Sequence, residues 1–146
     1  MKKIALIALI LFAVVACNKD KFNTKPQIEI SSYNTKVVGP NGNIIIQLKY
    51  TDKEGDLDNG TFVYIPVRAN RRKVPPSSKS YDSVSYTIPQ YPSNPDGYLQ
   101  LNLPWSSQHQ DYILENDSIY FRFVVVDRAG NKSDTVNSDR VVFLQP

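Results

Sequence analysis

The sequence has few of the residues that build cross-linked or reactive sites. Its 146 residues include one Cys, one His, one Met and one Trp. A single cysteine excludes an intrachain disulfide scaffold, and one cysteine with one histidine excludes a Cys/His metal cluster. The lone histidine, His109, lies in a polar segment, and no motif supplies it with a nucleophile and an orienting partner. We therefore expect a protein that is not an enzyme.

The charge is small and becomes smaller once the N-terminal segment is set aside. The formal net charge is +3, but Lys2 and Lys3 precede an apolar run that is unlike the rest of the chain. Without residues 1–16 the balance falls to about +1. A nearly neutral chain of this length predicts about one domain and excludes a strongly basic nucleic-acid-binding protein.

The N-terminal segment has the pattern of a secretory signal. Met1-Lys2-Lys3 is followed by the apolar residues Ile4–Ala16 and then by Cys17. A basic start, an apolar run and a small residue before the cut are typical of a signal peptide. The run is shorter than the roughly 20 residues of a membrane-spanning helix. We predict that residues 1–16 are removed.

The residues before the cysteine indicate what happens to it. Val14-Val15-Ala16 followed by Cys17 resembles the lipobox of bacterial lipoproteins. The resemblance implies cleavage before Cys17 and its acylation with more than one chain, and two chains give stable membrane anchoring. The alternative is an ordinary signal peptide with an incidental cysteine near its end. In either case Cys17 precedes every predicted strand, so it is not a core residue.

A polar tether follows the cysteine. Residues 17–26 end at Pro26 and show no hydrophobic period. Within them, Lys19-Asp20 partly resembles the signal that sends Bacteroidota lipoproteins to the outer face of the cell. We expect an outer-membrane, lipid-anchored protein, with the periplasmic and cell-surface sides both left open.

The pattern of the rest of the chain, residues 27–146, predicts β-strands. Short runs of alternating apolar and polar residues recur between turn clusters. The predicted strands are 27–31, 43–51, 61–68, 83–88, 98–103, 118–127 and 140–144. Seven such strands predict an all-β fold, an immunoglobulin-like antiparallel β-sandwich. Pro66 predicts an edge position or a bulge in its strand, and the segment 105–116 predicts a crossover with one helical turn.

Two segments add a resemblance to this pattern. Phe123–Ser133 ends an apolar strand in Asp-Arg-Ala-Gly-Asn-Lys-Ser and resembles the penultimate strand and loop of bacterial Ig-like and fibronectin-III-like domains. Tyr50–Leu57 resembles the exit of the second strand in Bacteroidota lipoproteins. The resemblance implies the fold and a place in the cell envelope more than it implies an activity.

Alternating carboxylates form the densest cluster of chemistry-bearing residues. They are Asp52, Glu54, Asp56 and Asp58, with glycines nearby. Oxygen ligands of this kind suit a hard cation such as Ca²⁺. The segment is not an EF-hand, because Leu57 stands where the loop needs glycine and Val63 stands where it needs the bidentate Glu.

The sandwich topology supplies a further carboxylate. In this fold the loops 52–60, 89–97 and 127–137 gather at one end. We therefore name Asp52, Asp56 and Asp127 as candidate ligands of a structural calcium ion, with Asp96 and Asp134 as further neighbours. The alternative is a solvated turn in which Asp and Gly serve backbone hydrogen bonds. A glycosidase acid/base pair is disfavoured, because a sandwich this small rarely contains the cleft it needs.

Tyrosines outside the predicted core are the other candidate site. Tyr91 and Tyr98 flank a proline-rich loop, and rings in such places stack on sugars or serve protein interfaces. The alternative is that they cover the ends of the sandwich. The sequence thus predicts a membrane-anchored, non-catalytic binding or adaptor module. A surface glycan-binding module and a structural subunit of an envelope complex are its alternatives.

Overall fold

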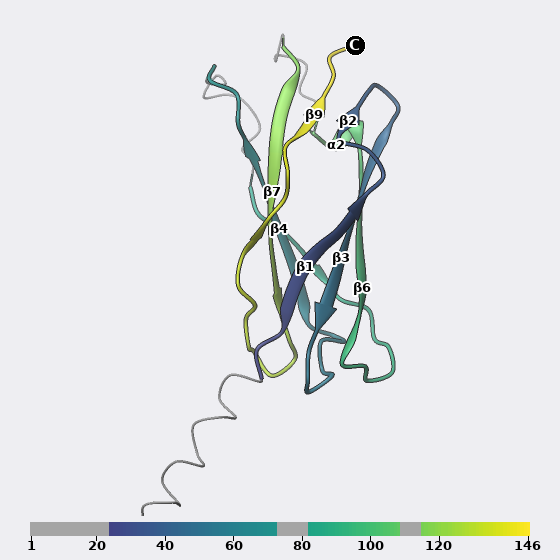
Figure 1. Cartoon of the computed structure of the whole chain (residues 1–146), viewed down its shortest axis with the longest axis vertical. Helices are drawn as coiled ribbons and strands as arrows, with labels where there is room; N and C mark the ends of the chain where they lie inside the picture. The colour runs from purple at the N-terminus through teal and green to yellow at the C-terminus, as the bar shows by residue number, and fades with distance from the viewer. Residues whose placement is uncertain (1–23, 73–81, 109–114) are drawn as a thin grey trace, which may run out of the picture.

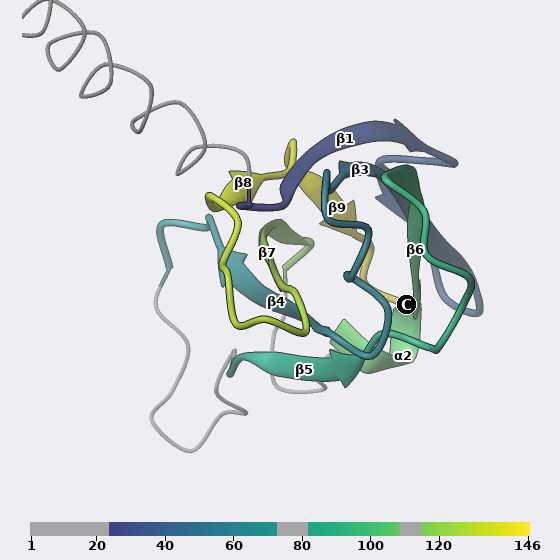
Figure 2. The same cartoon turned by 90° about the horizontal axis from the view of Figure 1, so that it is seen from below.

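The chain forms two β-sheets packed face to face (Figures 1 and 2). The computed structural model describes residues 24–72, 82–108 and 115–146. Their elements are β1 (Gln27–Tyr33), β2 (Val37–Val38), β3 (Asn43–Thr51), β4 (Thr61–Arg68), β5 (Val84–Thr87), β6 (Asp96–Pro104), α2 (Trp105–Gln108), β7 (Asp117–Val126), β8 (Val136–Asn137) and β9 (Val141–Phe143).

The two sheets differ in width. The smaller sheet has the order β1-β3-β6, and the larger has the order β2-β9-β7-β4-β5, with β8 also pairing β7. Neighbouring strands run antiparallel, apart from the parallel pair β2 and β9. The predicted all-β, immunoglobulin-like sandwich is thereby confirmed.

The core lies mainly between β3 of the smaller sheet and β7 of the larger sheet. Every second residue of β3 from Ile44 to Tyr50 is buried, and so is every second residue of β7 from Ile119 to Val125. Phe123 stacks on Phe62 of β4, with ring centroids 5.8 Å apart. Each such side chain contributes roughly 1.5–3 kcal/mol when it leaves water. The two-residue period of β3 and β7 thus fixes which faces of the sheets meet.

Each predicted strand run contains an observed strand. The bounds of β3 and β4 are those predicted, and β1 and β6 extend a few residues further. The short strands β2 and β8 were not predicted, because two residues carry no period. The helical turn expected in the crossover is α2, and the end of that crossover, 109–114, lies outside the described residues.

Pro66 lies where β4 lacks a second neighbour among the described residues. β5 pairs β4 only from Thr61 to Tyr64, whereas β7 pairs it along its whole length. The register with β7 continues through Pro66 without a bulge. The predicted edge position is therefore confirmed, and a missing N–H is tolerated there.

A buried ion pair joins β4 to β7 at the end opposite the acidic loops. The Arg68 guanidinium donates to Asp117 at 2.5 Å and to Glu115 at 2.6 Å. The side chains of Arg68 and Asp117 are 9% and 3% exposed. Arg68 lowers the pKa of the Glu115 carboxyl through the same hydrogen bond. This arginine is therefore part of the fold, although the basic residues Arg71, Arg72 and Lys73 follow it closely in the sequence.

Removal of the Asp117 carboxylate tests this assignment. We expect Asp117→Ala to lower the free energy of unfolding by about 3–5 kcal/mol, because the buried charge of Arg68 loses one of the carboxylates that balance it. The control is Glu29→Ala, which breaks an exposed pair with Lys49 at 3.8 Å and should cost less than about 1 kcal/mol. Urea unfolding measures both losses, and equal losses would contradict the buried-pair assignment.

Candidate functional site

Three loops meet at the end of the sandwich where β3 and β7 finish (Figure 1). The backbone N–H of Asp52 donates to the carbonyl of Pro95 at 2.7 Å, and that of Arg128 donates to the carbonyl of Asp56 at 3.1 Å. The Ser93 hydroxyl donates to the carbonyl of Gly55 at 2.9 Å. The gathering of loops 52–60, 89–97 and 127–137 predicted from the sequence is confirmed by these contacts.

The structure brings Asp52, Asp56 and Asp127 together. One carboxylate oxygen from each lies within 4.8 Å of the other two. Asp52 directly follows β3 and Asp127 directly follows β7, while Asp56 lies in the turn between β3 and β4. Strands β3 and β7 belong to different sheets, so the packing of the sheets sets the distance between two of these carboxylates.

Asp127 also closes its own loop. Its two carboxylate oxygens accept from the backbone N–H of Asn131 at 2.7 Å and from the Asn131 side-chain amide at 2.9 Å. The Gly130 N–H donates to the Asp127 carbonyl, and Gly130 has a φ of +90° that favours glycine. The Asp-Arg-Ala-Gly-Asn sequence therefore specifies a tight turn with an Asp at its base.

The Asp52 loop is closed in a similar way. One Asp52 carboxylate oxygen, Oδ2, accepts from the Asp56 N–H at 3.0 Å, and the Asp52 carbonyl accepts from the Gly55 N–H at 3.0 Å. Gly55 has a φ of +64°, and a Cβ at this position would lie 2.6 Å from the Ser93 Oγ. Glycine is needed here both for the backbone conformation and for the approach of the neighbouring loop.

The cluster contains two carboxylate oxygens without a donor. Asp52 Oδ1 and Asp56 Oδ1 are buried and have no hydrogen-bond partner. Burial raises the pKa of the Asp52 carboxyl, the Asp56 N–H opposes this, and the Asp56 and Asp127 carboxylates raise it further. The solvated-turn interpretation explains the hydrogen-bonded oxygens, but it does not explain these two.

The remaining acidic candidates lie outside the cluster. Asp58 is buried, accepts from the Asn59 amide at 3.1 Å and pairs with Arg128 at 3.6 Å. Asp134 is exposed and pairs with Lys25 at 2.5 Å. Asp96 is exposed at the start of β6, and it is not one of the three clustered carboxylates. Asp96 does approach the acidic loop, because it pairs with Thr51 in the register of β3 and β6, but neither Asp96 nor Asp134 belongs to the cluster.

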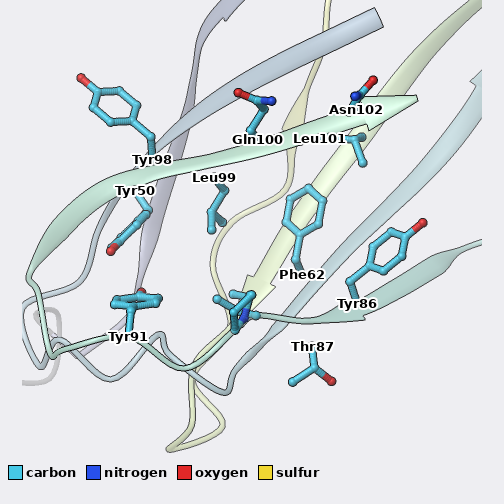
Figure 3. Close-up of a pocket in the computed structure, with 12 residues that line it drawn as sticks. Tyr50, Phe62, Tyr86, Thr87, Tyr91, Tyr98, Leu99, Gln100, Leu101 and Asn102 are labelled. Atoms are coloured by element: carbon cyan, nitrogen blue, oxygen red, sulfur yellow. The ribbon is translucent and has the colours of Figure 1, made fainter. Parts of the chain in front are cut away.

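A second candidate site is a cleft of about 660 Å³ between β5 and β6 (Figure 3). Phe62, Leu99 and Leu101 project between the two strands and form its apolar floor. Tyr98, Gln100 and Asn102 project from the opposite face of β6, away from this floor. β5 and β6 are the last strands of their sheets, so the cleft is the open side of the sandwich.

The tyrosines named from the sequence divide between packing and exposure. Tyr91 is half-buried in the cleft, its ring lies 6.3 Å from that of Tyr50, and burial raises the pKa of its hydroxyl. The buried Tyr91 hydroxyl has no hydrogen-bond partner. Tyr98 is 61% exposed. Tyr91 therefore lies within the cleft, whereas Tyr98 is free to contact a ligand on the outer face of β6.

Sequence reasoning missed Tyr86. Tyr86 alternates with Val84 and Ile88 along the chain, a pattern that predicts one shared inward face, yet Tyr86 is 51% exposed. Its ring stacks on Tyr64 at 6.1 Å and projects toward the cleft (Figure 3). The alternation assigns the face correctly, but it does not reveal that the narrower sheet leaves the last strand of the wider sheet uncovered.

Comparison with known proteins finds no matching family model and no similar curated protein. Among residues 24–72, 82–108 and 115–146, no helix is long and apolar enough to cross a membrane. Cys17, the candidate lipidation site, lies outside the described residues.

Neutralising Asp52 tests the electrostatics of the carboxylate cluster. We expect Asp52→Asn to raise the free energy of unfolding by about 1–3 kcal/mol in chelator at neutral pH, because it removes a buried charge that faces two carboxylates. The matched control is Glu54→Gln, which removes an exposed charge from the same loop and should change stability by less than about 0.5 kcal/mol. Urea unfolding measures both variants. A lower free energy of unfolding in Asp52→Asn would contradict the idea that the three carboxylates repel one another.

Proposed function

We propose that this chain is an outer-membrane lipoprotein that acts as a non-catalytic adaptor. Cys17 carries the lipid anchor, and the sandwich binds an extended segment of a partner protein in the cleft between β5 and β6. The observation that carries the proposal is the cleft itself, where an apolar floor lies beside the free edge of a long strand. An edge strand with unpaired N–H and C=O groups is a template for an added strand.

Between its end residues, Asp96 and Pro104, the edge of β6 lacks the devices that usually block such pairing. Residues 97–103 contain no charge and no proline, and the register of β6 with β3 continues without a bulge. The other edge of this sheet, β1, has a register shift between Ile30 and Ser32 and carries Glu29. A bulge and a charge protect an edge from pairing. The contrast between the two edges favours β6 as the strand that accepts a partner.

The floor of the cleft defines the chemistry of the partner. Successive residues of an added strand point to opposite faces, so every second side chain would lie over Phe62, Leu99 and Leu101. We therefore propose an extended segment with apolar residues at alternate positions. The described residues that line the cleft include no carboxylate, imidazole or thiol, which fits binding better than catalysis.

The anchor supports the choice of the cleft over the loops. Lys25, just before β1, pairs with Asp134, so the described chain begins at the end of the sandwich that carries the acidic loops. From Cys17 to Gln27 the chain spans at most about 35 Å. A short tether would hold the acidic end near the membrane and leave the cleft, on the side of the sandwich, open to a partner.

Lipidation is tested at Cys17. We expect the full chain to incorporate labelled palmitate in bacteria and to partition into the detergent phase, because acyl chains dominate membrane attachment. Cys17→Ser should lose both properties, whereas Ser32→Cys in that variant should restore neither. The assignment of the anchor to this cysteine would be contradicted if the wild-type chain partitioned into detergent without incorporating any labelled palmitate.

Strand addition is tested by placing a charge on either face of β6. We expect Leu99→Lys, which faces the cleft, to abolish photo-crosslinking of a partner to a probe at position 86 in intact cells. Gln100→Lys adds the same charge at the next residue but on the outer face, and crosslinking should persist. Thermal unfolding checks that both variants fold. Equal crosslinking in the two variants would contradict the cleft as the binding site.

A glycan-binding function is the second candidate, and it has its own surface. Tyr98, Gln100 and Asn102 are exposed on the outer face of β6, where a ring and two amides could stack on and hydrogen-bond a sugar. Binding to a polysaccharide array that Tyr98→Ala abolishes and Leu99→Lys leaves intact would favour this function. Tyr120→Ala, on another strand and outside the cleft lining, is the matched control.

A further inference from the structure

We propose that Asp52, Asp56 and Asp127 bind one calcium ion at the end of the sandwich. The site lies apart from the cleft and requires neither the lipid anchor nor a partner protein. It joins the ends of β3 and β7, which come from opposite sheets. The proposal rests on the spacing of the carboxylates, on two unpartnered buried oxygens and on the chemistry of the ligand set.

The spacing fits one ion of this size. Calcium binds oxygen at 2.3–2.6 Å, so two ligands on opposite sides of the ion lie about 4.6–5.2 Å apart. One oxygen from each of the three aspartates lies within 4.8 Å of the other two. A single calcium ion can therefore reach all three after small side-chain adjustments, without movement of the strands that carry them.

The unpartnered oxygens are an independent indication of a ligand. Asp52 is 1% exposed, and its Oδ1 has no hydrogen-bond donor, while Asp56 Oδ1 is also buried without a donor. Buried carboxylates are normally paired, hydrogen-bonded or coordinated to a metal. Arg128, a cation of the neighbouring loop, pairs with Asp58 at 3.6 Å rather than with Asp52 or Asp56. A cation between Asp52 and Asp56 would satisfy both oxygens at once.

The ligand set selects the class of metal. All three side chains offer oxygen, and three carboxylates supply three to six of the six to eight ligands that calcium takes. Zinc favours nitrogen and sulfur ligands, and neither occurs in this cluster. Magnesium demands near-ideal octahedral geometry and keeps several waters, so it suits a set of three protein carboxylates less well.

The site would also stiffen the loop next to the cleft. The Asp52 N–H donates to the Pro95 carbonyl, and Ser93 donates to Gly55, so the loop 89–95 rests on the acidic loop. This loop carries Tyr91, which lines the cleft. Calcium bound by Asp52 and Asp56 would therefore order the support on which Tyr91 lies.

Titration with calcium chloride alone tests the site. The full chain in detergent is stripped with chelator, and calcium binding is measured by calorimetry and by the thermal midpoint. We expect one calcium ion per chain and a rise in the midpoint that grows with calcium concentration, as mass action requires. Asp52→Asn should weaken calcium binding at least tenfold, although the metal-free variant is folded and more stable. Glu54→Gln should keep the full response.

Three results would overturn the proposal. The first is no heat of binding and no midpoint shift at millimolar calcium. The second is an unchanged calcium response in both Asp52→Asn and Asp127→Asn. The Asp127→Asn variant keeps an oxygen that can accept from the Asn131 N–H, so its loop should still close. The third is a larger midpoint shift with magnesium than with calcium. Partner crosslinking is not used as a readout, so a failure of the adaptor function leaves this test intact.

Discussion

The unequal width of the two sheets is the constraint on which the rest of the structure depends. Three strands, β1, β3 and β6, pack against a sheet that continues past β4 to β5. The apolar faces of β3 and β7 meet and are fully buried, but the cover ends at β6. The inward face of β5 is left partly in water, so Tyr86 is exposed and a cleft opens beside the half-buried Leu99. An open side of this kind retains the stability of a sandwich while offering an apolar surface to a partner.

Much of the fold could be predicted because alternation is a direct consequence of strand geometry. In β3 and β7 one face is apolar and buried, so a two-residue period gives both the strand and its orientation. β2 and β8 could not be predicted in this way, since each has two residues and is defined by its partner, β9 or β7. The edge position at Pro66 was predictable because proline lacks the N–H that a central strand needs.

The two candidate sites differ in how far the sequence anticipates them. Asp52 and Asp127 each follow a strong strand, and in a sandwich these strand ends lie together, so the sequence predicts their approach. It does not predict that Asn131 occupies both oxygens of Asp127 while one oxygen of Asp52 has no donor. Those details depend on the conformation of two turns. The cleft was not anticipated, because it arises from which strands are last in their sheets, and sequence order does not give this.

Amide hydrogen exchange of β6 tests the central claim most directly. The full chain is crosslinked in cells to the proposed partner, purified with it, and compared with the free chain. We predict slower exchange of alternate amides between Tyr98 and Leu103, because the N–H groups on the free edge of β6 gain hydrogen bonds to the added strand. The amides that already pair with β3 should change little. Unchanged exchange along β6, with protection confined to the loops at the acidic end, would contradict the claim.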